Sequence, residues 1–460
     1  MIILDELLAK LGPDVIKMAD AIPARNHRDA SHYPAVMPLA VAMPRTTEQV
    51  SAVMEICTAH RQPIAVQGGM TGLAAGAIPG KAEIALSLER MSGVEEVDVG
   101  AGTLTAWAGT PLATIQAAAE EAGFQCGIDL GARGTCTIGG NVATNAGGNQ
   151  VLRYGMTRRN VLGLEVVLAD GTTLTSLNKM LKNNAGYDWK EMFIGSEGTL
   201  GVVTRVVLQL HPKIEAIETA LVAVDDIRSG IQLLRKAGAA LPGGLLVFEA
   251  MWREFMKVAV DRIGLAAPFA TSHDLIILME APTTRGPDGQ TAFEAFLMSA
   301  LDAGLARDVL IARSGRDRSR FWAYRESVYD YSAKGIPAML GFDVSVPIPM
   351  FEDLVAAFRR DIPLAWPDAL FVIFGHAADS NVHLNVTRPG GLDDRTRRAI
   401  EELVYGHVAA LGGSVSAEHG IGRGKKAFLH LSRGPAEIAL MQRVKAALDP
   451  DGILSPGRIF

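Results

Sequence analysis

The stretch of sequence that decides the fold is DLGARGTCTIGGNVATNAGG, residues 129–148. It lies between two other glycine clusters, Gly68-Gly69-Met70-Thr71-Gly72 and the segment from Gly195 to Gly201. Successive glycines let consecutive backbone N–H groups point into one concavity, which can hold an anion such as a pyrophosphate. Each cluster alone could equally be a tight turn. Three clusters within about 135 residues favour a shared ligand-binding role.

Two common phosphate-binding motifs are absent. The segment Gly424-Lys425-Lys426 lacks both the first glycine and the hydroxyl of a P-loop. No G-x-G-x-x-G run opens a helix directly after a strand, so a Rossmann site is not supported.

The composition is that of a globular protein of two or three domains, with 460 residues, 48 of them glycine. The formal net charge of −6 argues against a nucleic-acid partner. The three cysteines form no C-x-x-C pair, so we expect buried, reduced thiols. The sequence shows no basic secretory n-region and no run of 18 apolar residues, so we expect a cytoplasmic protein without a membrane span.

The pattern along the chain predicts an α+β protein. Residues 1–35 indicate a short helical lead-in, and residues 125–212 alternate short β-rich runs with Gly/Asn/Thr loops. The pattern of predicted helices and strands changes near residue 213, where we expect a domain boundary. Beyond it, amphipathic helical segments such as 293–301 alternate with strands such as 275–279.

Two histidines flank a polar turn in the second half of the chain. The runs ending in His376 and containing His383 read as two strands, and a turn centred on Asp379-Ser380 would make the histidines cross-strand partners. Such partners have Cβ atoms about 4.5–5.5 Å apart, which suits two imidazoles that bind one cation. Glu418, in a dense Glu-His-Gly loop, could supply a third ligand. Two imidazoles and a carboxylate suit Zn²⁺ first, with Mn²⁺ or Fe²⁺ as alternatives. By spacing alone, two structural histidines and a solvated Glu are an equally open interpretation.

The decisive stretch resembles the signature of the vanillyl-alcohol-oxidase-type FAD-binding domain. More narrowly, it is similar to D-2-hydroxyglutarate dehydrogenases and D-lactate dehydrogenases. Further motifs match in the same order: Arg153-Tyr-Gly155, Gly186-Tyr-Asp188 and residues 193–204. The resemblance covers about residues 36–460 and implies a two-subdomain FAD-binding domain followed by an α+β cap domain with a mainly antiparallel sheet. We expect the FAD-binding domain over 1–213, the cap over 214–415, and a C-terminal segment, 416–460, that returns to the flavin site.

The resemblance also implies a set of cofactor contacts, with the pyrophosphate over 68–73. The residues assigned to FAD are Gln67, Gly68, Gly69, Thr71, Gly72, Leu73, Asp129, Thr137, Gly140, Asn141, Thr144, Asn145, Glu197 and Val202. Members with covalent flavin use a His in a glycine-rich loop. Met70 and Thr71 offer none, so FAD is predicted to be non-covalent. Met70 stands where close relatives often have Asn, and Ser455 departs from their usual C-terminal motif.

For the reaction, the resemblance implies a metal bound by His376, His383 and Glu418. His419 would then be the general base for the hydroxyl proton of a D-2-hydroxy acid, since His titrates near working pH. Arg325, in Trp-x-x-Arg-Glu, would bind the substrate carboxylate. The C2 hydrogen would leave as hydride to flavin N5. Asn385 and Tyr329 are further predicted substrate contacts.

The predicted substrate pocket departs from the family at three places. The turn 378–381 lacks the family's glycines, Tyr329 replaces a Thr, and Gly341 replaces a Lys. Loss of that Lys removes a cation that could meet a second carboxylate. We therefore expect D-lactate or another monocarboxylate to be accepted at least as well as D-2-hydroxyglutarate.

Other functions remain open at this point. On the same fold, the alternatives are a flavin alcohol oxidase, an alkyl-glycerone-phosphate-synthase-like enzyme, or the FAD subunit of a glycolate-oxidase-like complex. An alternative of another class is a metal-dependent hydrolase. The dehydrogenase interpretation predicts an electron acceptor, which could be a quinone, a cytochrome or an electron-transfer flavoprotein, and a homodimer is a possible assembly.

Overall fold

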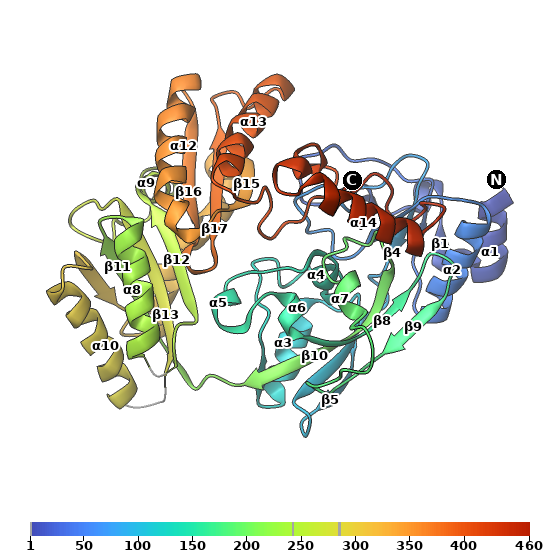
Figure 1. The fold of residues 1–460 in the computed structure, drawn as a ribbon, viewed down its shortest axis with the longest axis horizontal. Coiled ribbons are helices and arrows are strands. Elements are labelled where there is room, and N and C mark those ends of the chain that lie inside the picture. Colours follow the sequence, from blue (N-terminus) through green and yellow to red (C-terminus); the bar gives the residue numbers. More distant parts are fainter. Residues whose placement is uncertain (1, 242, 284–286) are drawn as a thin grey trace. The chain divides into compact units, whose positions relative to one another are not determined.

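A computed structural model describes residues 2–241, 243–283 and 287–460 (Figure 1). The chain divides into two compact units. Residues up to Lys213, together with Glu418–Phe460, form the first, here called the flavin unit after the cofactor that the sequence predicts for it. Ile214–Ala417 form the second, here called the cap unit.

The flavin unit contains a small mixed sheet of order β1-β2-β4-β3, in which β2 and β3 both run parallel to β4. Its strands are β1 (Ile16–Lys17), β2 (Ala40–Ala42), β3 (Ile64–Gln67) and β4 (Ile84–Ser87). Helix α2 (Thr47–Ala59) begins at Thr46, whose side chain accepts a hydrogen bond from the Gln49 N–H. Strand β3 leads directly into the first glycine cluster, which places that loop at the end of the parallel β3–β4 pair.

The flavin unit also contains an antiparallel sheet of order β5-β6-β10-β8-β9, with β7 paired to β10. Its strands are β5 (Val94–Asp98), β6 (Thr103–Trp107), β7 (Phe124–Cys126), β8 (Val161–Val167), β9 (Thr173–Ser176) and β10 (Val202–Pro212). The helices of this region are mostly single turns: α3 (Leu112–Glu121), α4 (Ile138–Thr144), α5 (Val151–Tyr154), α6 (Thr157–Asn160) and α7 (Lys190–Phe193). One apolar core joins both sheets.

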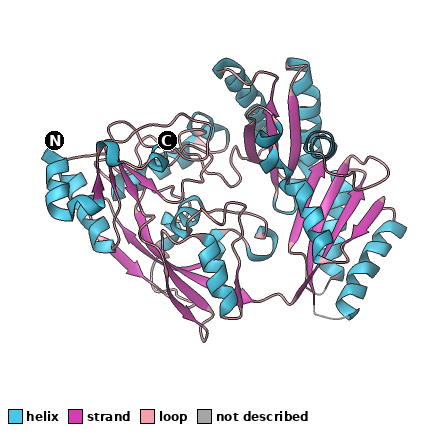
Figure 2. Cartoon of the chain, turned by 180° about the vertical axis from the view of Figure 1, so that it is seen from behind, coloured by secondary structure: helices cyan, strands magenta, loops and turns pink. Residues whose placement is uncertain are grey.

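The cap unit is built on a seven-stranded antiparallel sheet of order β14-β11-β13-β12-β16-β17-β15 (Figure 2). Its strands are β11 (Ala216–Val224), β12 (Val247–Trp252), β13 (Leu275–Thr283), β14 (Asp308–Ile311), β15 (Leu340–Ser345), β16 (Leu370–His376) and β17 (Asn381–Thr387). Its helices are α8 (Ile227–Ala240), α9 (Arg253–Val258), α10 (Pro287–Asp302), α11 (Gly315–Glu326), α12 (Phe351–Ala365) and α13 (Asp394–Ala410). Helices α9 and α11 share a core with the sheet through Phe255, Phe321 and Phe374. The α+β class and the mainly antiparallel cap sheet agree with the sequence prediction.

The N-terminal expectation was correct only for its first half. Helix α1 (Ile2–Val15) ends at Val15, and it is already kinked at Gly12, which has a φ of 79° and precedes Pro13. The following residues leave the helix because Ile16 pairs with Ala42 in the small sheet. Two 3-10 turns, Ala19–Ala21 and Ala24–His27, replace the predicted helix beyond that strand.

Two further expectations concern the whole chain. Across residues 2–241, 243–283 and 287–460, no helix is long and apolar enough to cross a bilayer. Cys57, Cys126 and Cys136 are all buried free thiols. The last helix, α14 (Pro435–Leu448), precedes a tail that returns to the small sheet, where Ile64 bridges Leu454.

Candidate functional site

The first glycine cluster approaches the decisive stretch so closely that side chains would not fit. A Cβ at Gly69 would lie 2.3 Å from the carbonyl oxygen of Thr135, and one at Gly68 would lie 2.8 Å from Oγ1 of Thr137. Thr137 is itself buried, and its Oγ1 has no hydrogen-bond partner in the described chain. A buried hydroxyl without a partner costs free energy unless a ligand or water meets it. This cradle therefore fits a polar ligand such as FAD.

Several predicted cofactor residues shape the loops with their side chains. Asn145 adopts the left-handed conformation, with a φ of 47°, and its Oδ1 accepts a hydrogen bond from the Arg158 N–H at 2.9 Å. The Thr144 hydroxyl donates to the Gly140 carbonyl at 3.0 Å. The Asp129 carboxylate accepts from side-chain amides of Gln116 and Asn149. These side chains fix the path of the backbone whose N–H groups could face a phosphate.

Gln67, the last residue of β3, directly precedes the cradle and is fully buried. Its amide nitrogen donates to the carbonyls of Asn26 and Ala77, each at 3.0 Å, and its Oε1 accepts from Asn26 Nδ2 at 2.8 Å. The side chain thus has protein partners on both atoms. Of the remaining predicted contacts, Val202 is buried at the start of β10, whereas Leu73 is 46 % exposed.

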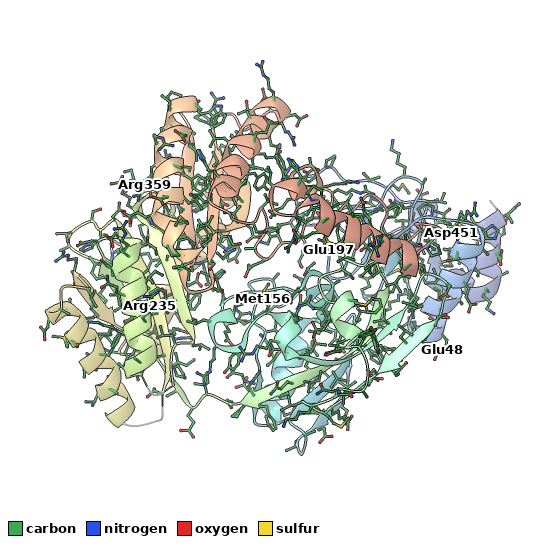
Figure 3. The ribbon with its side chains drawn as sticks, viewed as in Figure 1. Glu48, Met156, Glu197, Arg235, Arg359 and Asp451 are labelled. Carbon is green, nitrogen blue, oxygen red and sulfur yellow. The ribbon has the colours of Figure 1, made fainter. Side chains whose placement is uncertain are left out.

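Glu197, labelled in Figure 3, is also occupied by protein groups. Its carboxylate accepts hydrogen bonds from the backbone N–H groups of Ile421 at 2.8 Å and Gly422 at 2.7 Å. Burial raises the pKa of Glu197, and the two backbone donors oppose that shift. Glu418, at the other end of this loop, accepts from the Gly148 N–H at 2.8 Å. Glu197 and the Gly148 N–H therefore hold the two ends of the Glu418–Gly422 loop. The sequence did not reveal this role of Glu197.

In the cap unit, two of the three predicted metal ligands lie side by side. The rings of His376 and His383 have centroids 5.3 Å apart at an interplanar angle of 80°. Both residues are buried, with 6 % and 9 % of their surface exposed. Two imidazoles so placed form a donor pair suited to a divalent transition metal.

The predicted strand register, however, was wrong. His383 pairs with Phe374, and His376 pairs instead with Glu249 on β12. The reason lies in the turn, because Ala377–Asp379 form a 3-10 turn and Ser380 is left-handed, with a φ of 74°. The turn removes these residues from the ladder, so the histidines meet diagonally rather than directly.

Sequence reasoning missed Glu249, a fully buried carboxylate in the otherwise apolar strand β12. It contacts His376 Nδ1 through Oε1 and accepts a hydrogen bond from Arg325 Nε through Oε2, at 2.6 Å. Burial alone would raise the pKa of Glu249, but its electrostatic interactions and hydrogen bonds with His376 and Arg325 lower it to about 2. A single Glu within an apolar run, Leu245 to Trp252, was the signal that could have found it.

The predicted substrate residues differ in burial and in the groups that they contact. Arg325 is buried at the end of α11, and its guanidinium lies 4.6 Å from the centre of the Phe374 ring. Asn385 shares a sheet face with His383 and is paired across the strands with Gly341. Tyr329 is 70 % exposed on the 3-10 turn that follows α11.

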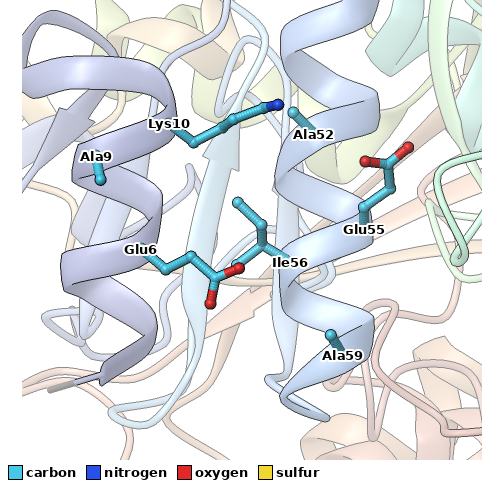
Figure 4. Close-up of a pocket in the computed structure, with 7 residues that line it drawn as sticks. All are labelled: Glu6, Ala9, Lys10, Ala52, Glu55, Ile56 and Ala59. Carbon is cyan, nitrogen blue, oxygen red and sulfur yellow. The ribbon is translucent and has the colours of Figure 1, made fainter.

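The end of the cap unit is tied to the same strands. The Ala417 N–H donates to the carbonyl of Asp343 at 3.2 Å, and Asp343 is the cross-strand partner of His383. Glu418 is the next residue along the chain, and consecutive Cα atoms are about 3.8 Å apart. None of the predicted site residues lines the open groove between α1 and α2, where Glu6, Lys10 and Glu55 gather (Figure 4).

Comparison with known proteins identifies the family. Residues 38–176 match the FAD binding domain family, and residues 213–459 match the family described as FAD linked oxidases, C-terminal domain. D-2-hydroxyglutarate dehydrogenase from Bos taurus is 40 % identical over 418 residues, 91 % of this chain and 76 % of the relative. The enzyme of that name from Xanthomonas citri pv. viticola is 35 % identical over 97 % of both chains.

The chain belongs to the FAD-linked D-2-hydroxyacid dehydrogenase family. It is accordingly an FAD-dependent oxidoreductase. Among solved structures, substrate-bound p-cresol methylhydroxylase matches 99 % of this chain and 96 % of its own, with a TM-score of 0.78 at 15 % identity. An alkyldihydroxyacetonephosphate synthase matches 99 % of this chain and 85 % of its own, with a TM-score of 0.74 at 18 % identity. These likenesses confirm the vanillyl-alcohol-oxidase-like FAD fold that was expected from residues 129–148.

Proposed function

We propose that this protein oxidises a D-2-hydroxy acid to the 2-oxo acid. The observation that carries the proposal is the cluster of His376, His383 and Arg325 on one buried patch of the cap unit, in a chain of an FAD-linked dehydrogenase family. A hydroxyl beside a carboxylate matches such a patch, because two imidazoles can hold a cation and a guanidinium can bind the carboxylate. The relatives are D-2-hydroxyglutarate dehydrogenases, which supports this class of substrate.

The proposed metal ligands are His376, His383 and Glu418. Support comes from the paired imidazoles of His376 and His383. It also comes from Ala417, the residue before Glu418, whose N–H donates to the carbonyl of Asp343, the cross-strand partner of His383. Zn²⁺ fits the donor set of two nitrogens and one carboxylate, and it keeps a position free for substrate. Glu418 accepts a hydrogen bond from the Gly148 N–H through Oε1 at 2.8 Å, which supports a fixed position for this carboxylate.

His419 is the proposed general base, and the reaction balances as a two-electron oxidation. The hydroxyl proton passes to an imidazole nitrogen of His419. The C2 hydrogen leaves with the electron pair of its C–H bond while the C2–O bond becomes a carbonyl. Bound FAD would supply the hydride acceptor at N5, and the bound cation would supply a Lewis acid that lowers the hydroxyl pKa. The anchors of the Glu418–Gly422 loop, Glu197 and Gly148, support a fixed position for the base.

The proposed activity is tested by anaerobic reduction of the purified flavoprotein. We expect D-2-hydroxy acids, such as D-lactate and D-2-hydroxyglutarate, to bleach the flavin absorbance, and the L-enantiomers to leave it unchanged. A dye or quinone should reoxidise the flavin faster than O₂ does. Bleaching by simple alcohols with rapid O₂ turnover would instead establish an alcohol oxidase, and a colourless protein would contradict the proposal.

Gly341 is the proposed reason for a preference for monocarboxylates. It lies opposite Asn385, on the sheet face that carries His383, and a Cβ there would lie 3.1 Å from Asn385 Oδ1. Its backbone is an ordinary strand, so a Lys can be accommodated with a small shift of the amide. An added cation on this face would meet a second carboxylate.

We expect Gly341→Lys to raise the ratio of kcat/KM for D-2-hydroxyglutarate over D-lactate by roughly 10–100-fold, since a charge-assisted hydrogen bond contributes about 1.5–3 kcal/mol. Steady-state kinetics with a dye acceptor measure the ratio. Gly341→Gln is the matched control, because it adds a chain of similar length without charge and should leave the ratio nearly unchanged. Equal ratios for the wild type and the Lys variant would contradict this account of specificity.

The other functional expectations remain predictions from the sequence. These are non-covalent attachment of FAD, the electron acceptor (a quinone, a cytochrome or an electron-transfer flavoprotein), a homodimeric assembly and a cytoplasmic location.

A further inference from the structure

We propose that Glu249 is a positioning residue that holds the metal ligand His376 and the substrate anchor Arg325 in a fixed geometry relative to each other. The inference rests on the proposed function, because His376 and Arg325 have those roles only there. Its basis is the way that one carboxylate divides its two oxygens between two functional side chains.

The geometry lies entirely within the cap unit. Glu249 is on β12, directly across from His376 on β16, and Arg325 reaches it from the last turn of α11. Oε1 contacts His376 Nδ1, and Oε2 accepts from Arg325 Nε at 2.6 Å. All three residues are buried, with exposed fractions of 1 %, 6 % and 7 %, so water does not compete for these bonds.

The contact to His376 sets the tautomer of its imidazole ring. A carboxylate beside Nδ1 favours the tautomer in which Nδ1 carries the proton, so Nε2 is the ring nitrogen with the lone pair. Such carboxylate–histidine pairs fix the ring's orientation and raise its basicity as a ligand. Glu249 therefore makes His376 a preformed nitrogen donor.

The contact to Arg325 involves Nε and does not use the two terminal amino groups of the guanidinium. Nε is bound by Glu249, and the plane of the group lies over the Phe374 ring. Within residues 2–241, 243–283 and 287–460, no acceptor bonds the two terminal amino groups of Arg325. Those groups form the fork that binds carboxylates in two parallel hydrogen bonds. Glu249 thus holds the stem of the anchor and leaves its fork for an anion.

A second buried carboxylate in the same sheet has a purely structural environment. Glu280, on β13, is also 1 % exposed, and it accepts two hydrogen bonds from Arg318 of α11, at 2.6 and 2.9 Å. Trp322 Nε1 and the Thr219 hydroxyl complete its partners. Glu280 thus has the same burial as Glu249 and an Arg partner from the same helix, without a histidine, which makes it the matched control.

The test is the Zn²⁺ affinity of the purified, FAD-loaded protein, measured by competition with a chromophoric chelator. Glu249→Gln keeps the shape but offers one acceptor and one donor, so it cannot accept from both neighbours. The charged Arg325 should retain the oxygen, which turns the new amide nitrogen toward His376. We expect Zn²⁺ affinity to fall about 10–100-fold. Activity lost at low Zn²⁺ should return at saturating Zn²⁺, whereas Glu280→Gln should bind Zn²⁺ like the wild type.

Thermal unfolding by circular dichroism reports whether each variant folds. If Glu249→Gln does not fold, Glu249→Asp carries the test, because it keeps the charge but is too short to reach both partners, and its Zn²⁺ affinity should also fall. Wild-type affinity in the folded Glu249 variants would overturn the inference, as would an equal loss in Glu280→Gln. Failure of the proposed function looks different, because then the wild type would bind no Zn²⁺ or His383→Ala would bind it unchanged.

Discussion

Replacing His419 with Gln is expected to lower kcat about 10²–10⁴-fold, the usual contribution of a positioned general base. Glutamine can still hydrogen-bond to the substrate hydroxyl, but it cannot take up its proton. The loss should fall on the chemical step, so the measurement is the rate of flavin reduction by D-lactate in a single turnover. The anchors of this loop, Glu197 and Gly148, do not involve the His419 side chain, so the backbone should keep its path.

Two observations check that this effect is chemical. FAD and Zn²⁺ contents should match those of the wild type, and the reduction rate of the variant should rise with pH as deprotonated substrate becomes more abundant. His407→Ala is the matched control, because His407 lies on α13, where its Nε2 is paired with Asp361 at 2.9 Å. A variant at position 419 that reduces its flavin at the wild-type rate would rule out the base.

Removal of the proposed metal is expected to leave a yellow protein that D-2-hydroxy acids no longer reduce. Lewis-acid stabilisation of the developing alkoxide contributes several kcal/mol, which corresponds to roughly 10³-fold or more in rate. FAD should stay bound, because the predicted cradle around Gly68, Gly69 and Thr137 belongs to the flavin unit, whereas His376 and His383 belong to the cap unit. The measurement is flavin bleaching before and after treatment with EDTA, with metal content determined by elemental analysis.

Adding Zn²⁺ back distinguishes loss of the metal from damage to the protein. Added Zn²⁺ should return the bleaching rate to the EDTA-treated wild type, and it should not do so for His383→Ala. Bleaching that survives complete removal of the metal would refute the role of the cation. The FAD-linked oxidoreductase class would stand in that case, since it rests on the family and not on the metal.

Much of this molecule could be predicted because its signals are local. Gly68, Gly69 and Gly148 lie where a side chain would clash with neighbouring atoms. The run at 129–148 resembles the signature of an FAD-binding fold as a continuous stretch of sequence. Glu249 could not be assigned a role in the same way. Its sequence neighbours are apolar, and its partners are 76 and 127 residues away along the chain.

By itself, the sequence determined the α+β class, the FAD-linked family and the placing of His376 and His383 on neighbouring strands. The tertiary structure alone decided which groups meet: His376 with Glu249, His383 with Phe374, and Glu197 with the backbone at 421–422. The physical reason is that turn residues and side-chain alternation act over a few positions. Strand register and buried ion pairs, in contrast, are set by the packing of segments distant in sequence. A single 3-10 turn after His376 was enough to move the register.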